Sequence, residues 1–294
     1  MPDYAVVVLS AFCIALYTGQ TFFNKLYSST YEGPAGSACP VFSIIYGLIV
    51  SVVTFALNKG RFAPSAVTVL LGVFNGCILF LYNLGMIQAA RRGPYTFQSI
   101  VMLFGSIVVC LVFSAGFWGD HITPMQLVGI AVMLLSFVAL NAGGLKLAGV
   151  RKGYYFWVFL LFFSNGFYGV FMDSQQRVFP SERNEMIILT FASLSVLSLA
   201  YLGSGERGKI GSAFVMSRRA LVFAVMSSLC AAFAVFILMI LLKHVPSYIL
   251  FTINNGGVLV LSAVLSFIIL KEKPTKLTVL GVLLAVASIV MLSI

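Results

Sequence analysis

Charged residues divide this chain into long apolar stretches. Ten stretches of 18 residues or more contain no Asp, Glu, Lys or Arg, and they cover 4–24, 33–58, 62–90, 93–119, 122–145, 153–172, 186–205, 220–242, 244–270 and 277–294. Each can cross about 30 Å of hydrocarbon as a helix that rises about 1.5 Å per residue. They are apolar throughout and lack the alternation of barrel strands. The pattern predicts an all-α integral membrane protein with ten transmembrane helices.

The composition agrees with this class. Hydrophobic residues make up 61% of the chain and charged residues 9%, against about 25% charge in a soluble domain. The net charge of +10 comes from Lys and Arg in the short connections, where anionic lipid and insertion rules favour them. We therefore expect the lipid bilayer as a partner, and no nucleic acid. The first 25 residues lack a basic leader and a cleavage site, so we expect segment 4–24 to be retained.

The chain contains no motif for covalent or metal chemistry. Its five cysteines form no C-x-x-C pair, and its two histidines lie in separate connections. H-E-x-x-H, G-x-S-x-G and Walker sequences are missing,. We expect no enzyme, no cofactor and no metal, and a pump driven by an ATPase domain of its own is excluded for this chain.

The two halves of the chain are similar at an offset of 152 residues. The matched pairs are Pro94 and Pro246, Gly105 and Gly257, Asp120 and Glu272, Thr123 and Thr275, Gly129 and Gly281, and Ser136 and Ser288. The second and third spans need a further shift of several residues. We therefore predict a first five-helix repeat at 1–145, a linker at 146–152 and a second repeat at 153–294.

An odd number of spans in each repeat inverts the second copy across the membrane. Inverted repeats around a central binding site are common among secondary transporters. The alternative is a duplication that only enlarged a structural protein.

The chain resembles ten-helix permeases of the EamA type in the drug/metabolite transporter superfamily, over its whole length. The family's marker is an apolar helix ending in L-G-E, followed by Gly nine residues after the Glu. The second half has Leu270-Lys271-Glu272 before Gly281, and the first half has Trp118-Gly119-Asp120 before Gly129. The resemblance implies a permease in which spans 1, 3, 4, 6, 8 and 9 enclose the site. The family's mid-helix proline is missing, and Asp120 shortens the first carboxylate.

The distribution of basic residues gives an expectation for sidedness. Odd-numbered connections carry 13 Lys and Arg, and even-numbered connections carry 5. The positive-inside rule then puts both termini outside, whereas many members of the family have both in the cytoplasm, so the side stays open. We expect a bacterial inner (plasma) membrane, and a homodimer is left open.

Polar residues inside a membrane are costly, so those present are candidates for function. Asn254 and Asn255 lie mid-span and precede Gly256 and Gly257. The two glycines permit a bend or interruption that would present both amides to a substrate. Alternatively both amides bond neighbouring helices and the glycines allow close packing.

Six further residues are candidates to bind the substrate. They are polar or aromatic residues inside spans 1, 3, 4 and 6: Tyr17, Tyr82, Asn83, Gln98, Asn165 and Tyr168. Gln98 can reach either a cavity or the membrane interface. Tyr17 and Tyr168 are one residue out of register in the repeat, and both could line a pseudo-symmetric cavity.

Charged residues near the spans have two interpretations. Asp173 lies four residues before Arg177, which favours an i,i+4 pair near the membrane face,. Lys25 falls on Arg177 in the repeat. These two cations either extend to lipid headgroups or stand at opposite mouths of the cavity as gating charges that attract anionic or zwitterionic substrates.

These observations predict a secondary transporter that moves a small polar metabolite by alternating access through a central cavity. An amino-acid-like or other zwitterionic or amine solute fits a site lined by amides and tyrosines. One alternative is an organic-anion or phosphate-ester carrier that uses Lys25 and Arg177. An alternative of another class is an intramembrane lipid-handling or structural protein.

Overall fold

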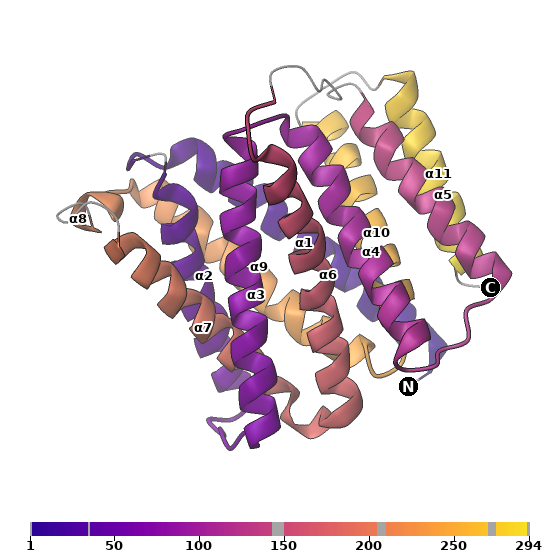
Figure 1. The fold of residues 1–294 in the computed structure, drawn as a ribbon, viewed down its shortest axis with the longest axis horizontal. Coiled ribbons are helices and arrows are strands. Elements are labelled where there is room, and N and C mark those ends of the chain that lie inside the picture. The colour runs from indigo at the N-terminus through magenta and orange to yellow at the C-terminus, as the bar shows by residue number, and fades with distance from the viewer. Residues whose placement is uncertain (1, 35, 143–149, 205–209, 270–274, 293–294) are drawn as a thin grey trace. The chain divides into compact units, whose positions relative to one another are not determined.

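The chain folds into a series of α-helices (Figure 1). The computed structural model describes residues 2–34, 36–142, 150–204, 210–269 and 275–292. The helices are α1 (Asp3–Thr30), α2 (Ala38–Leu57), α3 (Ala66–Ala90), α4 (Tyr95–Gly116), α5 (Pro124–Asn141), α6 (Tyr154–Val178), α7 (Arg183–Ser204), α8 (Ile210–Ala213), α9 (Arg218–Leu241), α10 (Ser247–Ile269) and α11 (Lys276–Leu292), with a 3₁₀ turn, η2 (Pro180–Glu182). Leu270-Lys271-Glu272 and most of the predicted linker lie outside the described residues.

The membrane class predicted from the sequence is confirmed. Within the described ranges, 9 helices are long and apolar enough to cross a membrane. The tenth predicted span corresponds to α11, an apolar helix of 17 residues, which is roughly 26 Å long and slightly shorter than the hydrocarbon layer. Ten spans therefore stay a prediction.

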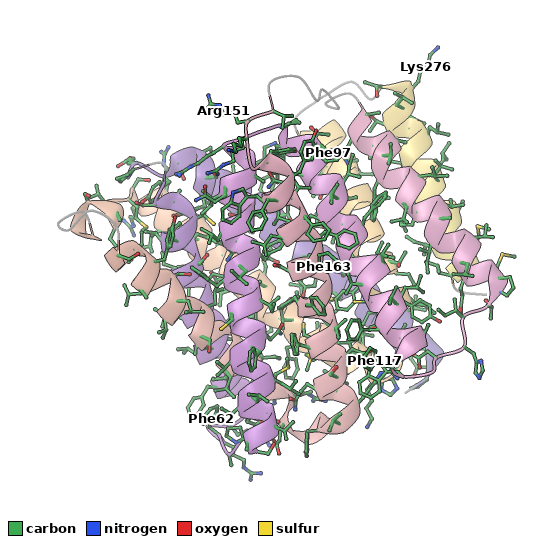
Figure 2. All side chains as sticks on the ribbon, in the orientation of Figure 1. Phe62, Phe97, Phe117, Arg151, Phe163 and Lys276 are labelled. Atoms are coloured by element: carbon green, nitrogen blue, oxygen red, sulfur yellow. The ribbon has the colours of Figure 1, made fainter. Side chains whose placement is uncertain are left out.

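Large apolar side chains cover the outside of the helices, as expected of surfaces that face lipid. Phe117 is 77% exposed and Phe156 is 64% exposed, and aliphatic side chains of α2, α3, α5 and α11 are exposed along their lengths. Figure 2 shows these side chains extending from the ribbon, Phe62 and Phe117 among them. A water-soluble monomer rarely exposes such continuous apolar surface.

Equivalent positions of the sequence repeat begin equivalent helices. Thr123 caps α5, because its hydroxyl accepts a hydrogen bond from the backbone N of Gln126. Thr275 accepts in the same way from the backbone N of Thr278 at the start of α11. Pro94 and Pro246 immediately precede α4 and α10. Proline and hydroxyl residues are favoured at these places, since the first N–H groups of a helix lack partners within it.

The chain forms two compact units, and each unit takes segments from both halves of the sequence. Unit 1 contains Met1–Ile14, Leu84–Val170 and His244–Ile294, and unit 2 contains Ala15–Asn83 and Phe171–Lys243. The compact units are therefore not the predicted sequence repeats. The repeat boundaries remain a prediction about duplication.

In unit 1, α5 packs along α11 through reciprocal contacts (Figure 1). Ser136 Oγ donates to the carbonyl of Gly281 at 2.8 Å, and Ser288 Oγ donates to the carbonyl of Gly129 at 2.6 Å. The serines are equivalent in the 152-residue repeat, and so are the glycines. Contacts between an early residue of one helix and a late residue of the other require the two helices to run antiparallel. Small residues let the backbones approach closely enough for these bonds.

In unit 2, α2 and α7 pack in the same reciprocal way. Ser195 Oγ donates to the carbonyl of Ile44 at 3.1 Å, and Ser51 Oγ donates to the carbonyl of Ile188 at 3.2 Å. Ser51 and Ser195 are 144 residues apart, as are Ile44 and Ile188. The spacing here is eight residues less than 152, which agrees with the shift that the sequence comparison requires around the second span.

We expect the glycines of the α5–α11 contact to tolerate alanine unequally. A Cβ at Gly281 would lie 2.7 Å from Leu140 Cγ and 2.9 Å from the Leu140 backbone N, whereas one at Gly129 would meet only side-chain atoms at 3.1 Å or more. Gly281→Ala should lower the free energy of unfolding by about 1–3 kcal/mol, and Gly129→Ala by less. Thermal unfolding of detergent-solubilised protein measures this.

The matched control is Gly116→Ala at the end of α4, where an added Cβ meets nothing within 4 Å. If Gly281→Ala unfolds at the same temperature as Gly116→Ala, the close contact between α5 and α11 does not contribute as described.

Candidate functional site

The ten residues predicted from the sequence divide between the two compact units. Unit 1 contains Gln98, Asn165, Tyr168, Asn254 and Asn255, and unit 2 contains Tyr17, Lys25, Tyr82, Asn83 and Arg177. Each group is therefore described within its own unit.

Two asparagines of unit 1 meet on α4. Asn165 Nδ2, from α6, donates to the carbonyl of Met102 at 2.9 Å. Asn255 Nδ2, from α10, donates to Ser106 Oγ at 2.8 Å, and Ser106 Oγ donates in turn to the carbonyl of Leu103. Met102 and Ser106 are one helical turn apart. The two amides thus link three helices at one level.

Asn254 differs from its neighbour because its amide oxygen has no partner. The residue is 8% exposed, and Asn254 Oδ1 is buried without a hydrogen bond in the described structure. A buried acceptor left in this state costs about 1–3 kcal/mol, so such groups in native proteins call for an explanation. A ligand with an N–H donor would satisfy this oxygen.

The predicted interruption of the helix at this point is wrong, while the predicted bend stays a prediction. α10 runs as one α-helix from Ser247 to Ile269, through both asparagines and both glycines. The glycines instead allow close packing, because a Cβ at Gly256 would collide with the Met133 side chain of α5, and one at Gly257 with Ile14 of α1. The backbone carbonyls here remain part of the helix, and the amide side chains supply the polar groups.

Gln98 does not lie with the asparagines. Its Nε2 donates to the carbonyl of Met86 at 3.2 Å, and its Oε1 is buried without a partner among the described residues. The bonds from Ser114 to Ser247 and from Ser106 to Asn255 show that α4 and α10 run antiparallel. At about 1.5 Å per residue, Gln98 then lies roughly 13 Å along α4 from the level of Asn254.

Tyr168 lies three residues after Asn165 on α6, on the same face of the helix, and is half-buried,. Asn165 and Asn255 both bond α4, at Met102 and Ser106, and Tyr168 and Asn254 are their neighbours along α6 and α10. We name Asn165, Tyr168, Asn254, Asn255 and Ser106 the asparagine cluster. A solute in contact with it would meet amides, a hydroxyl and an aromatic ring.

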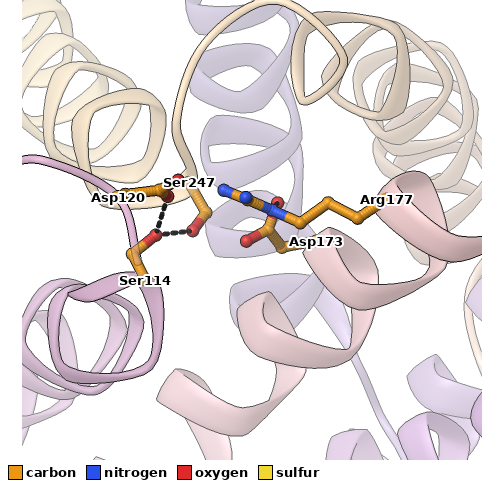
Figure 3. Close-up of polar contacts among 5 residues, drawn as sticks. All are labelled: Ser114, Asp120, Asp173, Arg177 and Ser247. Carbon is orange, nitrogen blue, oxygen red and sulfur yellow. Dashed lines mark hydrogen bonds and ion pairs between the residues drawn. The ribbon is translucent and has the colours of Figure 1, made fainter. Parts of the chain in front are cut away.

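The carboxylate of the first family marker, Asp120, ties α4 to α10. Ser114 Oγ donates to Asp120 Oδ2 at 2.8 Å and lies 3.3 Å from Ser247 Oγ (Figure 3). The backbone N of Asp120 also donates to the carbonyl of Ser114 at 3.0 Å. Ser247 begins α10, and a negative charge is favourable near the N-terminus of a helix. Asp120 thus fixes the end of one helix beside the start of another.

In unit 2, the predicted polar residues also bond between helices. Asn83 Nδ2, from α3, donates to Ser43 Oγ of α2 at 2.9 Å. Ser227 Oγ of α9 donates to the carbonyl of Gln20 on α1 at 3.0 Å. Tyr17 and Tyr82 are half-buried. The amide of Asn83 therefore serves helix packing in this structure.

The expected i,i+4 ion pair is present, but it lies inside a candidate membrane span. Arg177 Nε is 3.0 Å from Asp173 Oδ1 (Figure 3), and 3% of the Asp173 side chain and 27% of the Arg177 side chain are exposed. α6 continues to Val178, so both residues belong to a candidate span, whereas we expected Arg177 just past it. Lys25 also lies within its helix, α1, and is exposed.

The sequence interpretation missed one buried carboxylate, Glu185. It lies in the first turn of α7 and is 8% exposed. Asn58 Nδ2 donates to its Oε1 at 3.0 Å, and its Oε2 has no partner in the described part of the chain. Charge-free stretches define spans that begin after such a residue, so this criterion could not find it. In the sequence, the polar residues Asn58 and Asn184 near the ends of the predicted spans were the features that could have indicated this buried carboxylate.

The site residues offer hydrogen bonding rather than metal chemistry. In the described ranges, no group of three or more His, Cys, Asp or Glu is placed to hold a metal ion. Amides, hydroxyls and rings can bind and orient a polar solute without changing it covalently.

Comparison with solved structures supports the helical fold over the whole chain. A solved crystal structure superposes with a TM-score of 0.76 at 18% identity, over 99% of this chain and 96% of that one. No curated protein matches. The model of the EamA-like transporter family matches residues 152–294. This match places residues 152–294, the second half of the chain, in the EamA-like transporter family of the drug/metabolite transporter superfamily.

Proposed function

We propose that this membrane transporter moves a small polar metabolite that carries an ammonium group, such as an amino-acid-like or other zwitterionic or amine solute, by alternating access. The buried, unpartnered oxygen of Asn254 is the observation that carries the proposal. It can accept a hydrogen bond from a solute, and an ammonium group is a strong, charged donor. Asn165, Asn255 and Ser106 hold neighbouring helices together around that position.

Two inverted five-helix repeats, at 1–145 and 153–294, would supply the alternation. The reciprocal antiparallel contacts of α5 with α11 and of α2 with α7 support this architecture. In an interface related by a two-fold axis, each contact occurs twice with the partners exchanged. The α5–α11 pair makes exchanged contacts at an offset of 152 residues, and the α2–α7 pair makes them at an offset of 144 residues.

The ion pair in α6 disfavours the organic-anion or phosphate-ester carrier. Arg177 uses its Nε to bind Asp173, which compensates part of its charge. Lys25 is exposed, so solvent and lipid headgroups compete for it. A desolvated anion would need cations that are free to bind it.

The remaining parts of the proposal follow from the transporter class. The partners are a small-molecule substrate and the lipid bilayer, and we place the protein in a bacterial inner membrane. We propose no enzymatic activity, no cofactor and no nucleic-acid partner.

A thermal-shift screen against a metabolite library tests the proposal directly. A ligand that binds only the folded protein raises its stability by mass action. We expect amino-acid-like or amine solutes to raise the unfolding temperature, and the same solutes to enter proteoliposomes that contain the protein. Stabilisation by organic anions alone would favour the anion carrier, and stabilisation by lipids alone would favour a lipid-handling protein.

Asn254→Ala should weaken substrate binding without destabilising the fold. A hydrogen bond to a charged group contributes about 1.5–3 kcal/mol, so we expect roughly a tenfold to hundredfold loss of affinity. The unfolding temperature should not fall, since this oxygen has no hydrogen-bond partner in the described part of the chain. Calorimetric titration and thermal unfolding measure the two quantities.

Asn141→Ala is the matched control, because its Nδ2 donates to the carbonyl of Phe137 within its own helix. It should leave substrate affinity unchanged. Unchanged affinity in Asn254→Ala would remove the central support of the proposal.

Asn255→Ala should show the opposite pattern. It removes the bond to Ser106, and interhelical hydrogen bonds in membrane proteins contribute about 0.6 kcal/mol on average. We expect a lower unfolding temperature, and recovery of part of the loss in Asn255→Ala/Ser106→Ala, where no partner is left behind. A double variant as unstable as the sum of the single variants would contradict a direct contact.

Neutralising Lys25 or Arg177 should change substrate affinity by only a small factor, because a zwitterion does not need their charge. Arg177→Gln should also lower stability by about 1–2 kcal/mol, a reduced value because Arg177 is partly exposed. Lys25→Gln should not. An affinity loss of roughly a hundredfold in either variant, about 2.7 kcal/mol, would instead identify an anion carrier.

A further inference from the structure

Two connections of unit 1 carry four basic residues and are fastened to each other. Arg91 and Arg92 follow α3, and Arg151 and Lys152 precede α6. The backbone N of Arg151 donates to the carbonyl of Arg92 at 2.8 Å. We name these four residues the basic clasp.

The clasp is held rigidly by the residues that follow it. Tyr154 OH donates to the carbonyl of Pro94 at 2.7 Å. A Cβ at Gly93 would lie within 3 Å of the Tyr154 ring, so only glycine leaves the ring its place. These contacts therefore keep the backbones of the two basic connections beside each other.

One of the four cations has a structural role. Arg92 Nη1 donates to the carbonyl of Gln88 at 2.8 Å and also to the Gln88 side chain. Its guanidinium carbon lies 5.7 Å from the centre of the Trp157 ring, within the range of a cation–π contact,. Arg92 thus orients the connection.

The other three cations face outward without a compensating carboxylate nearby in sequence. Arg91, Arg151 and Lys152 are exposed, and Figure 2 shows the Arg151 side chain projecting away from the ribbon. Residues 84–170 contain one acidic residue, Asp120, which lies beyond the far end of α4 and binds Ser114. Within the part of the chain that the structure describes, Arg91, Arg151 and Lys152 form no ion pair, so their charge is available to an anion.

Aromatic rings mark the depth of the clasp in the membrane. Tyr95 begins α4, and Tyr155 and Phe156 lie in the first turn of α6; they are 60%, 60% and 64% exposed. Exposed Tyr and Trp side chains concentrate at the level of lipid headgroups. The first turns of two helices also present partial positive charge to an anion at this level.

We propose that the basic clasp binds the phosphodiester headgroup of an anionic phospholipid, whose acyl chains lie along the exposed rings of α4 and α6. Basic pockets between membrane helices recognise such headgroups. The shape fits a lipid better than a free phosphate, since the exposed rings beside the cations need an apolar partner. This site is separate from the asparagine cluster and does not rest on the proposed transport function.

The test uses purified full-length protein in a neutral detergent. Phosphatidylglycerol or phosphatidylcholine is added in mixed micelles, and bound lipid is counted by native mass spectrometry while thermal unfolding is followed. We expect selective retention of phosphatidylglycerol and a higher unfolding temperature with it. A contribution of about fivefold from each basic residue near the surface gives at least a tenfold loss of affinity in the triple variant Arg91→Gln/Arg151→Gln/Lys152→Gln.

A matched control removes three exposed basic residues from unit 2: Lys59→Gln/Arg61→Gln/Arg219→Gln. It should retain phosphatidylglycerol as the wild type does. Equal losses in both triple variants would show a general effect of net charge and overturn the proposal, as would normal retention in the clasp variant.

Two further experiments control for poor folding of the Gln variant and for binding of free phosphate in place of lipid. Arg91→Lys/Arg151→Lys keeps the charge and should restore most of the selectivity even if the Gln variant folds poorly. Inorganic phosphate alone should not raise the unfolding temperature. Stabilisation by inorganic phosphate equal to that by phosphatidylglycerol would assign the clasp to a free anion and not to a lipid.

Discussion

Close approach of helix backbones at small residues is the constraint on which this structure depends. In hydrocarbon, polar groups find no water, so each hydroxyl must bond protein. Ser136 and Ser288 bond the carbonyls of Gly281 and Gly129, and at Gly281 an added Cβ would lie 2.9 Å from the Leu140 backbone N of the facing helix. Since lipid tails are as apolar as the side chains, packing and these bonds must hold the helices together. Small residues at reciprocal positions thus determine which helices pair.

The sequence predicted the helices well, because the apolar stretches are limited by charges that must lie near the membrane surface. It placed helix ends less well. Asp173 and Arg177 neutralise each other across one turn, so α6 could include both, and a rule that stops at the first charge ended the span too early. Glu185 was missed for the same reason: Asn58 donates to its carboxylate and makes its burial possible.

The candidate site was predicted in composition but not in geometry. The sequence identified the polar residues, and the structure brings Asn165 and Asn255 together on α4 while Gln98 lies about two turns and a half away,. Whether two residues of different helices lie at the same depth depends on how far the helices are shifted along each other. The sequence pattern of a single helix does not encode this shift. The interruption at Gly256 and Gly257 was wrong because glycine suits both a bend and a close contact, and only the neighbours Met133 and Ile14 decide between them.

The free-energy cost of removing an ammonium group from water helps to decide which kind of ammonium compound would bind to the asparagine cluster. Taking an isolated ammonium ion out of water costs several kcal/mol even after the protein relaxes, whereas one hydrogen bond to Asn254 Oδ1 returns about 1.5–3 kcal/mol. Tyr168 could add a cation–π contact of up to roughly 2 kcal/mol. These terms barely offset the cost for a simple cation, and no carboxylate belongs to the cluster. A zwitterion carries its own counter-charge, which reduces the cost of leaving water. The same amide groups therefore favour an amino-acid-like solute over an organic cation of the same size.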